Sequence, residues 1–237
     1  MIGKTNQDMI SNTLCSLTIL DSGSKLAINQ LKNRIQRQPG LVLNIVGTDY
    51  AYIMIAKNAS KWMEDVLESS SSQINFTNVS SLNSKKYIVI LRDPIDRWCS
   101  GITQYLHGEE VLRDLKDRNV LDLLFSQVHF DWHTVPQVKF LEGINTDDCI
   151  FFKMESNITN TNRLSNFQNK VLDFLETELE LDLSKSNIIP FKLMEPDAGQ
   201  NAQYFTKHRI HFEIQTNPRY MEQIKAYYAE DIKLYNQ

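Results

Sequence analysis

Short apolar runs alternate along this chain with stretches in which apolar residues recur at helical spacing. Runs rich in Val, Ile and Leu are typical of buried strands, and here they occupy 41–46, 51–55, 87–91 and 149–152. The helical spacing predicts helices at 62–67, 94–107, 164–179 and 219–235, and two short ones within 109–128. Strands that alternate with helices predict an α/β fold, in which helices flank a parallel sheet.

Turn-forming and polar residues mark the connections. The turn residues Gly47-Thr48-Asp49 indicate a hairpin between the first two strands, which would make the first strand an edge addition to the sheet. Serine and asparagine dominate 69–84, so we expect a surface loop there. Proline and glycine punctuate 185–218, which predicts irregular structure. Near the N-terminus, a helix over 26–37 would end at Pro39-Gly40.

The composition is that of one ordinary globular domain. We expect 1–237 to form a single domain, with 1–40 as a polar N-terminal extension. Hydrophobic residues make up 42% of the chain and charged residues 23%, as in soluble globular proteins. The net charge of -4 argues against a nucleic-acid partner, because such proteins are usually basic.

Targeting and metal-binding signals are weak. No run approaches the ~20 apolar residues of a membrane span, and the first residues lack the apolar core of a signal peptide. We therefore expect a soluble cytoplasmic protein, plausibly bacterial or viral, whose oligomeric state stays open. The three cysteines have no metal or disulfide spacing, so we expect no metal.

The third apolar run ends at an arginine. Ile88 to Leu91 leads directly into Arg92, and Asp93-Pro94 then breaks the strand and starts a helix. Ser100 lies eight residues after Arg92, about two helical turns along. Ligands of open α/β sheets bind at the carboxyl ends of strands. A guanidinium and a hydroxyl at such an end indicate a phosphate site, because arginine binds phosphate through charge-assisted bonds.

The second apolar run ends in a similar way. Lys57-Asn58-Ala59-Ser60-Lys61-Trp62 follows it and leads into a helix. A loop before a helix N-terminus offers backbone N–H groups and a positive dipole end to an anion. Lys57 and Lys61 add positive charge and Ser60 adds a donor. The chain therefore has two candidate anion-binding strand ends.

These two motifs together resemble those of sulfotransferases that use 3′-phosphoadenosine 5′-phosphosulfate (PAPS). Lys57-Asn58-Ala59-Ser60 resembles their 5′-phosphosulfate loop, and Arg92 to Ser100 resembles their 3′-phosphate motif. Trp132-His133-Thr134-Val135-Pro136-Gln137 and Cys149 to Glu155 are similar to later segments of the carbohydrate (Golgi-type, family 2-like) branch. The resemblance implies a P-loop-NTPase-like three-layer fold and PAPS as co-substrate. It also implies transfer of a sulfuryl group to a hydroxyl or amine of an acceptor, for which a saccharide is the expected class.

The resemblance also implies roles for single residues. Lys57 would stabilise the leaving-group oxygen, and His133 would be the general base. The residues expected to bind PAPS are Lys57, Asn58, Ala59, Ser60, Lys61, Trp62, Arg92 and Ser100. Arg97 is the second arginine of the 3′-phosphate motif, but a helical arginine one turn from an aspartate is commonly structural.

The assignment of the base has alternatives. His133 beside Trp132 is equally consistent with a packed structural histidine. The rival bases are His107 and the carboxylates of the first helix, which are Glu64, Asp65 and Glu68. The cluster Lys207-His208-Arg209 with His211 is consistent with contact to an anionic ligand, but a solvated loop is the ordinary interpretation.

Two other functions compete with sulfuryl transfer. A P-loop nucleotide kinase is disfavoured, because Gly3-Lys4-Thr5 lacks the upstream glycine loop and the preceding strand of that motif. A non-catalytic nucleotide-binding module stays open, because the segment between the two anion motifs contains no histidine. Binding of 3′-phosphoadenosine 5′-phosphate in preference to ATP would separate a sulfotransferase from a kinase.

Overall fold

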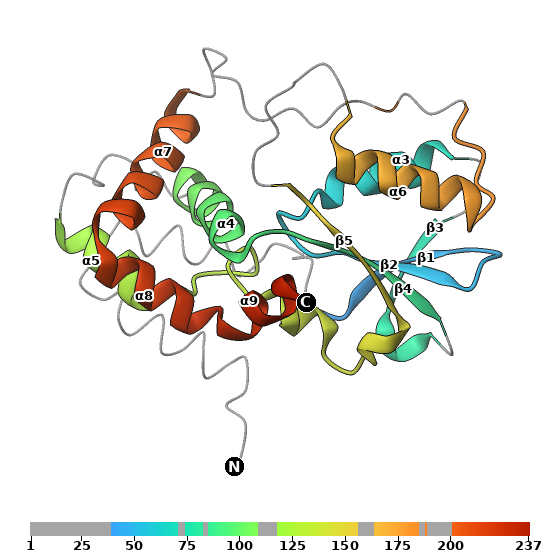
Figure 1. The fold of residues 1–237 in the computed structure, drawn as a ribbon, viewed down its shortest axis with the longest axis horizontal. Helices are drawn as coiled ribbons and strands as arrows, with labels where there is room; N and C mark the ends of the chain where they lie inside the picture. Colours follow the sequence, from blue (N-terminus) through green and yellow to red (C-terminus); the bar gives the residue numbers. More distant parts are fainter. Residues whose placement is uncertain are drawn as a thin grey trace.

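The structure is a computed structural model, and it describes residues 39–70, 74–82, 85–108, 118–155, 164–184, 188 and 201–237. A five-stranded open sheet in the order β3-β1-β2-β4-β5 is the middle layer of this part of the chain (Figure 1). Its strands are β1 (Leu41–Ile45), β2 (Tyr50–Ile53), β3 (Ile74–Asn78), β4 (Lys86–Leu91) and β5 (Cys149–Lys153).

The sheet is mixed, whereas the sequence predicted a parallel one. The pairs β2–β4 and β4–β5 are parallel, but β1 runs antiparallel to both of its neighbours, β2 and β3. The hairpin of β1 and β2 is confirmed. The prediction that β1 is the edge was wrong, because β3 pairs beyond it.

Strand β3 lies within 69–84, where a surface loop was predicted. That prediction was wrong: apolar and polar residues alternate over Ile-Asn-Phe-Thr, as in a strand, but the run is short, lies among serines and asparagines, and has three exposed residues. Its backbone pairs with β1 in a continuous register from Leu41↔Asn78 to Ile45↔Ile74. The partner strand therefore decides the conformation, which is how tertiary context overrides local propensity.

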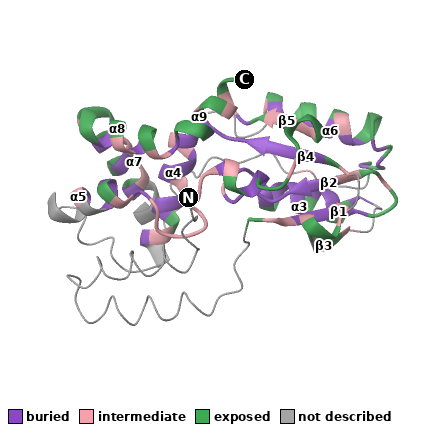
Figure 2. Ribbon diagram, turned by 90° about the horizontal axis from the view of Figure 1, so that it is seen from below, coloured by how far each residue is buried: buried purple, intermediate pink, exposed green. Residues whose placement is uncertain are grey.

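Helices cover both faces of the sheet, because strand residues alternate between the faces. On one face lie α3 (Ser60–Ser69) and α6 (Asn166–Thr177), which bury Trp62, Val66 and Phe167 in a cluster with strand residues. On the other face lie the 3-10 helix η4 (Gln137–Leu141) and α9 (Ala229–Asn236). There Phe140 and Leu141 are buried in a cluster that Leu234 also contacts. Figure 2 shows that the central strands β2 and β4 are mostly buried between these layers, whereas the edge strand β3 is largely exposed.

Further helices form a second apolar core beside the sheet (Figure 1). They are α4 (Pro94–Gly108), α5 (Arg118–Gln127), α7 (Asn201–Thr216) and α8 (Pro218–Tyr227). Trp98 of α4 and Phe125 of α5 are fully buried in this core. The ring of Phe125 stacks on that of Tyr220 with 4.0 Å between the centroids. The core joins α4, which follows a strand end, to the C-terminal helices.

Helix α7 lies within 185–218, where the sequence predicted irregular structure, so this prediction was wrong for 201–216. Its apolar residues lie on two faces: Ile210 and Ile214 are buried, whereas Phe205 and Phe212 are exposed. A helix with apolar residues on both faces lacks the one-sided period that marks a helix in a sequence. The predicted terminal helix at 219–235 is two helices, α8 and α9, which meet at Tyr228.

The other predicted helices are confirmed as α4 for 94–107 and α6 for 164–179. Helix α5 confirms the second of the two short helices within 109–128. The helix predicted at 26–37, most of the N-terminal extension and the first half of 109–128 lie outside the described residues. None of the described helices is long and apolar enough to cross a membrane.

The second core makes a stability prediction. Phe125→Ala should lower the free energy of unfolding by about 3–5 kcal/mol, because it leaves a cavity under Tyr220. Phe212→Ala, at a position 55% exposed, should change it by less than about 1 kcal/mol. Urea unfolding followed by circular dichroism measures both. Equal effects would mean that the helical core does not contribute as its packing indicates.

Candidate anion-binding site

The carboxyl ends of β2 and β4 lie side by side, because the two strands are parallel neighbours. After β2 the chain turns sharply: Lys57 (φ 68°) and Ala59 (φ 56°) both have left-handed backbone conformations, and Ala59 directly precedes α3. After β4, the Asp93 carboxylate accepts the backbone N–H groups of Ile95 (3.0 Å) and Asp96 (2.9 Å). This cap explains why α4 begins directly after the strand.

The Arg92 side chain joins the two strand ends. It is 9% exposed, and its Nη1 donates a hydrogen bond of 3.2 Å to the Lys57 carbonyl oxygen. Within the described residues, no carboxylate lies within the 4.0 Å of an ion pair with it. Burial lowers the pKa of the guanidinium, and the nearby Asp96 carboxylate partly opposes this. The positive charge of Arg92 therefore lacks an ion-pair partner among these residues.

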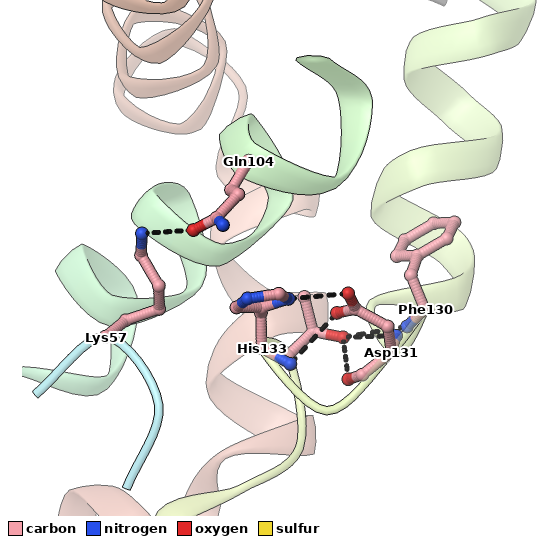
Figure 3. A network of polar contacts seen from close by, with 6 residues as sticks. Lys57, Gln104, Phe130, Asp131 and His133 are labelled. Carbon is pink, nitrogen blue, oxygen red and sulfur yellow. Dashed lines mark hydrogen bonds and ion pairs between the residues drawn. The ribbon is translucent and has the colours of Figure 1, made fainter. Parts of the chain in front are cut away.

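Lys57 lies in the same positive field. Its Nζ donates a 2.6 Å hydrogen bond to Oε1 of Gln104 on α4 (Figure 3). Its pKa is lowered to about 8, first because the amine is buried and then because the charges of Arg92 and Lys207 repel the proton. Asp131 opposes this effect, but its carboxylate does not form an ion pair with Lys57. Repelling cations held close together are typical of a site that binds an anion.

Lys207 enters this cluster from α7. It lies one turn before Ile210, which is buried against Trp98 and Ile102 of α4, so it is on the side of α7 that faces α4. Lys207 is half-buried, and its pKa is lowered by burial and by the charge of Arg92. The sequence had favoured a solvated loop here; in the structure this residue lies on a packed helix.

Ser100 and Gln104 lie one turn apart on the same side of α4 as Asp96, because the three positions are spaced by four residues. Since Gln104 contacts the Lys57 amine, this side of α4 faces the cation cluster. Ser100 is half-buried. The predicted convergence of Ser100 with Arg92 is consistent with this placement, and the hydroxyl's role in binding stays a prediction.

The rest of the predicted phosphosulfate loop divides into two groups. Asn58 is fully buried, and its Nδ2 donates to the Ile90 carbonyl oxygen (2.7 Å) and to Oε1 of Gln137 (2.5 Å). Ala59 and Ser60 lie at the start of α3 and are also buried, so their predicted contact with the phosphosulfate stays a prediction.

Lys61 and Trp62 point elsewhere. Lys61 has a side chain 68% exposed and pairs with Asp65 at 2.8 Å on its own helix. Trp62 packs edge-on against Phe167 in the core, with 5.7 Å between the ring centroids. The structure therefore does not bring these two side chains to the cation cluster, and their predicted contact with PAPS stays a prediction.

Arg97 is a buried structural connection. Its side chain is fully buried, and it donates to the carbonyl oxygens of Ala56 (Nε, 3.0 Å) and Val135 (Nη1, 2.6 Å). Its guanidinium also lies over the Phe140 ring, 5.7 Å from the centroid. Of the two interpretations of Arg97, these bonds favour the structural one, in which α4 holds the β2 end against the segment after His133.

His133 forms a dyad with Asp131, the two residues being close to Lys57 in Figure 3. The imidazole Nδ1 lies 2.6 Å from Asp131 Oδ2, and the His133 backbone N–H donates to Oδ1 (3.0 Å). A carboxylate on Nδ1 favours the tautomer whose Nε2 is the acceptor. The ring also stacks on Trp132, with 3.7 Å between the centroids. This arrangement is that of an oriented base, and packing beside Trp132 is equally present.

A glycine allows α4 to approach this dyad. A Cβ at Gly101 would lie 2.5 Å from the carbonyl oxygen of His133, which is closer than non-bonded atoms approach. Ser100 is the neighbour of this glycine in α4. The contact therefore fixes the histidine segment against the same helix that carries Ser100 and Gln104.

Sequence reasoning missed several members of this site. Asp131 had a local signal, because an aspartate two residues before a histidine can orient its ring. Gln104 had none, since it meets Lys57 only through the packing of α4. Lys207 was considered as a contact to an anionic ligand, but nothing in the sequence placed it beside Lys57. Of the rival bases, Asp65 is 57% exposed and pairs with Lys61. The side chain of His107 lies outside the described residues.

No protein-family model, curated protein or solved structure matches this chain. In the described part of the chain, no three His, Cys, Asp or Glu side chains gather in a way that could hold a metal ion. What the site can do chemically therefore rests on its own residues. These are three cationic side chains (Lys57, Arg92 and Lys207), a histidine–aspartate dyad and the start of a helix.

The charge cluster predicts an unusual lysine. Lys57 should titrate with a midpoint of about 8, whereas the exposed Lys61, whose bond to Asp65 raises its pKa, should titrate above its ordinary value. Arg92→Gln should raise the midpoint of Lys57, because a repelling charge is removed. NMR of ¹³C-methylated lysines across the alkaline range measures both residues.

The same shift gives a pH dependence with a definite sign. The protonated amine attracts an anion, so the affinity for an anion should fall as the pH rises through about 8 and the amine loses its charge. A Lys57 midpoint near 10.5, the ordinary value, would contradict the cluster as described.

Proposed function

We propose that this chain is a PAPS-dependent sulfotransferase, which moves a sulfuryl group to a hydroxyl or amine of an acceptor. The observation that carries the proposal is the junction of two strand ends, where Arg92 bonds to the Lys57 carbonyl and both side chains are cationic without an ion-pair partner among the described residues. Lys57 lies in the segment that resembles the phosphosulfate loop, and Arg92 begins the segment that resembles the 3′-phosphate motif.

The residues fit a ligand with two separated phosphates. Arg92, with Ser100 on α4, binds the 3′-phosphate, because a guanidinium offers several donors in a planar arrangement. Lys57 and the start of α3 bind the phosphosulfate, because a helix start favours negative charge. Asn58, Ala59 and Ser60 supply the loop backbone there. We also assign the P-loop-NTPase-like topology to the sheet as part of this proposal.

The transfer step needs little covalent chemistry from the protein. The acceptor oxygen or nitrogen forms a bond to sulfur while the bond between sulfur and the bridging phosphate oxygen breaks, and negative charge develops on that oxygen. The Lys57 ammonium stabilises this charge. The acceptor's proton passes to Nε2 of His133, whose other nitrogen is held by Asp131. Lys57, protonated below pH 8, is in the form that this role requires.

A saccharide is the acceptor class we propose. The support is the resemblance of the segment from Trp132 to Gln137 to the carbohydrate branch of the family. This segment carries His133 of the dyad and contacts α4, so it lies where an acceptor must approach the base.

A non-catalytic nucleotide-binding module is the second candidate. It shares the strand-end cations but gives no role to the dyad, so the two candidates differ only in turnover. A nucleotide kinase is less well supported, because the loop after β2 reverses through non-glycine residues with positive φ, Lys57 and Ala59, where a P-loop has glycine.

Titration with 3′-phosphoadenosine 5′-phosphate is the test of the donor site. The wild-type chain should bind this bisphosphate in preference to ATP. Arg92→Ala should weaken its binding by about 2–5 kcal/mol, because a buried charge-assisted contact is lost. Calorimetry measures the affinities, and near-ultraviolet circular dichroism checks that the variant is folded.

The exposed Arg219, at the start of α8, supplies the matched control. Arg219→Ala changes the net charge equally and should leave the affinity unchanged. An Arg92→Ala variant that binds the bisphosphate like the wild type would remove the basis of the proposal, and so would a preference for ATP.

Turnover separates the enzyme from the binding module. His133→Ala should lower the rate of sulfuryl transfer by roughly 10²–10⁴ while the bisphosphate affinity is retained. The pH profile of kcat/KM should differ from that of the wild type in this variant, because the residue proposed to accept the proton is lost. Radiolabelled PAPS with a panel of saccharides measures the transfer.

His129 is the matched control for His133. It is half-buried four residues earlier, near Tyr227, and His129→Ala should keep the wild-type pH profile. If His133→Ala keeps near-native turnover, the histidine is structural and the carboxylates of α3 become the candidates. No transfer to any acceptor by a wild-type chain that binds the bisphosphate would favour the binding module.

A further inference from the structure

The side-chain amide of Gln137 lies between the two strand ends and is fully buried. Its Nε2 donates to the Arg92 carbonyl oxygen (2.9 Å), and its Oε1 accepts the Arg92 backbone N–H (3.1 Å). The last ladder bond beside this point runs from the Met154 N–H to the Leu91 carbonyl oxygen (2.7 Å). Gln137 therefore bonds both backbone groups of Arg92 as a neighbouring strand would, one residue beyond the sheet.

The same amide also reaches the other strand end. Oε1 of Gln137 accepts a hydrogen bond from Nδ2 of Asn58 (2.5 Å), and that nitrogen donates as well to the Ile90 carbonyl oxygen (2.7 Å). Asn58 directly follows Lys57 in the chain. The Gln137 amide is thus bonded to Arg92, and also to Asn58, the neighbour of Lys57 in the chain.

Gln137 is itself held by the C-terminal helix α9. The Asp231 carboxylate accepts the backbone N–H of Gln137 on Oδ2 (2.6 Å) and that of Val138 on Oδ1 (2.9 Å). Asp231 is fully buried. These two N–H groups begin the 3-10 helix η4 and have no partner within it, so a carboxylate from α9 completes the start of η4. A continuous series of hydrogen bonds joins α9 to Arg92.

We propose that Gln137 is a positioning residue, which sets the spacing between Lys57 and Arg92, and that Asp231 holds it in place. This inference rests on the proposed function, because the spacing matters for a ligand that bridges both cations. Gln137 bonds to the backbone of Arg92 and to Asn58, and its own role is exerted through them. Loosening it should therefore affect a two-phosphate ligand more than a one-phosphate ligand.

This selectivity is what a merely structural glutamine would not produce. Gln137→Met keeps the length of the side chain and removes the hydrogen bonds. The dissociation constant for 3′-phosphoadenosine 5′-phosphate should rise about 10–100-fold, the range seen when a residue that orients a ligand-binding group is lost. Adenosine 5′-phosphate has a single phosphate and does not bridge the two cations. Its dissociation constant should therefore change by less than about threefold.

Two further variants complete the experiment. Gln168→Met removes another fully buried glutamine, which forms the capping box at the start of α6, and it should leave both dissociation constants unchanged while it lowers stability. Asp231→Asn keeps one acceptor for two N–H groups, so it should weaken bisphosphate binding less than Gln137→Met does. Calorimetry and urea unfolding of all four proteins, the wild type included, give affinity and stability separately.

The outcomes separate this inference from the proposed function. If the wild type binds the bisphosphate, and Gln137→Met leaves its affinity unchanged or weakens both ligands equally, the positioning role is overturned. If the wild type does not bind the bisphosphate, the proposed function fails, and inorganic pyrophosphate becomes the probe. The positioning role would then be supported if Gln137→Met binds pyrophosphate more weakly than Gln168→Met does. It would be overturned if the two variants bind pyrophosphate equally, or if the wild type does not bind it.

Discussion

The candidate site depends on one buried guanidinium, that of Arg97. It extends from α4 and is bonded to the Ala56 carbonyl after β2 and the Val135 carbonyl after the histidine dyad. Taking a charged group out of water costs several kcal/mol, and burial accordingly lowers its pKa. The two charge-assisted bonds and the contact with Phe140 offset part of this cost. A neutral side chain of similar size could fill the volume, but it could not hold three separate segments together.

The position of Arg97 explains why the other cations can stand so close to one another. Lys57 directly follows Ala56 in the chain. Arg92 lies just before the start of α4, the helix that carries Arg97 in its first turn. The segments are therefore held by hydrogen bonds from the Arg97 side chain to backbone carbonyls. The fold does not depend on an ion pair of Lys57 or Arg92. Burial first, and then repulsion by the charges of Arg92 and Lys207, lowers the pKa of Lys57. A bound anion would relieve that repulsion, so the free site stores a driving force for binding an anion.

A rigid frame, and cations that form no ion pair with any carboxylate in the described part of the chain, distinguish this site from ordinary surface charge. On α3, Lys61 is exposed and pairs with Asp65, as solvated helix lysines commonly do. At the strand ends the neutral polar side chains and the charged side chains have different roles. Asn58 and Gln137 are fully buried and bond to backbone or to each other. The charged groups bond to neutral acceptors, Lys57 to Gln104 and Arg92 to the Lys57 carbonyl. Such a division is expected where geometry must survive without a ligand.

The sequence by itself determined the strands that carry the site and the two residues at their ends. An apolar run that stops at Lys57 or Arg92 is a local pattern, and the start of α4 after Asp93-Pro94 follows from capping and from the fixed φ of proline. The tertiary structure alone decided the rest. Strand β3 exists because β1 pairs with it, and α7 escaped the helical pattern because apolar residues lie on both of its faces. Lys207, Gln104 and Asp231 reach the site from helices distant in the chain, and no local period records which side of a helix will meet a strand end.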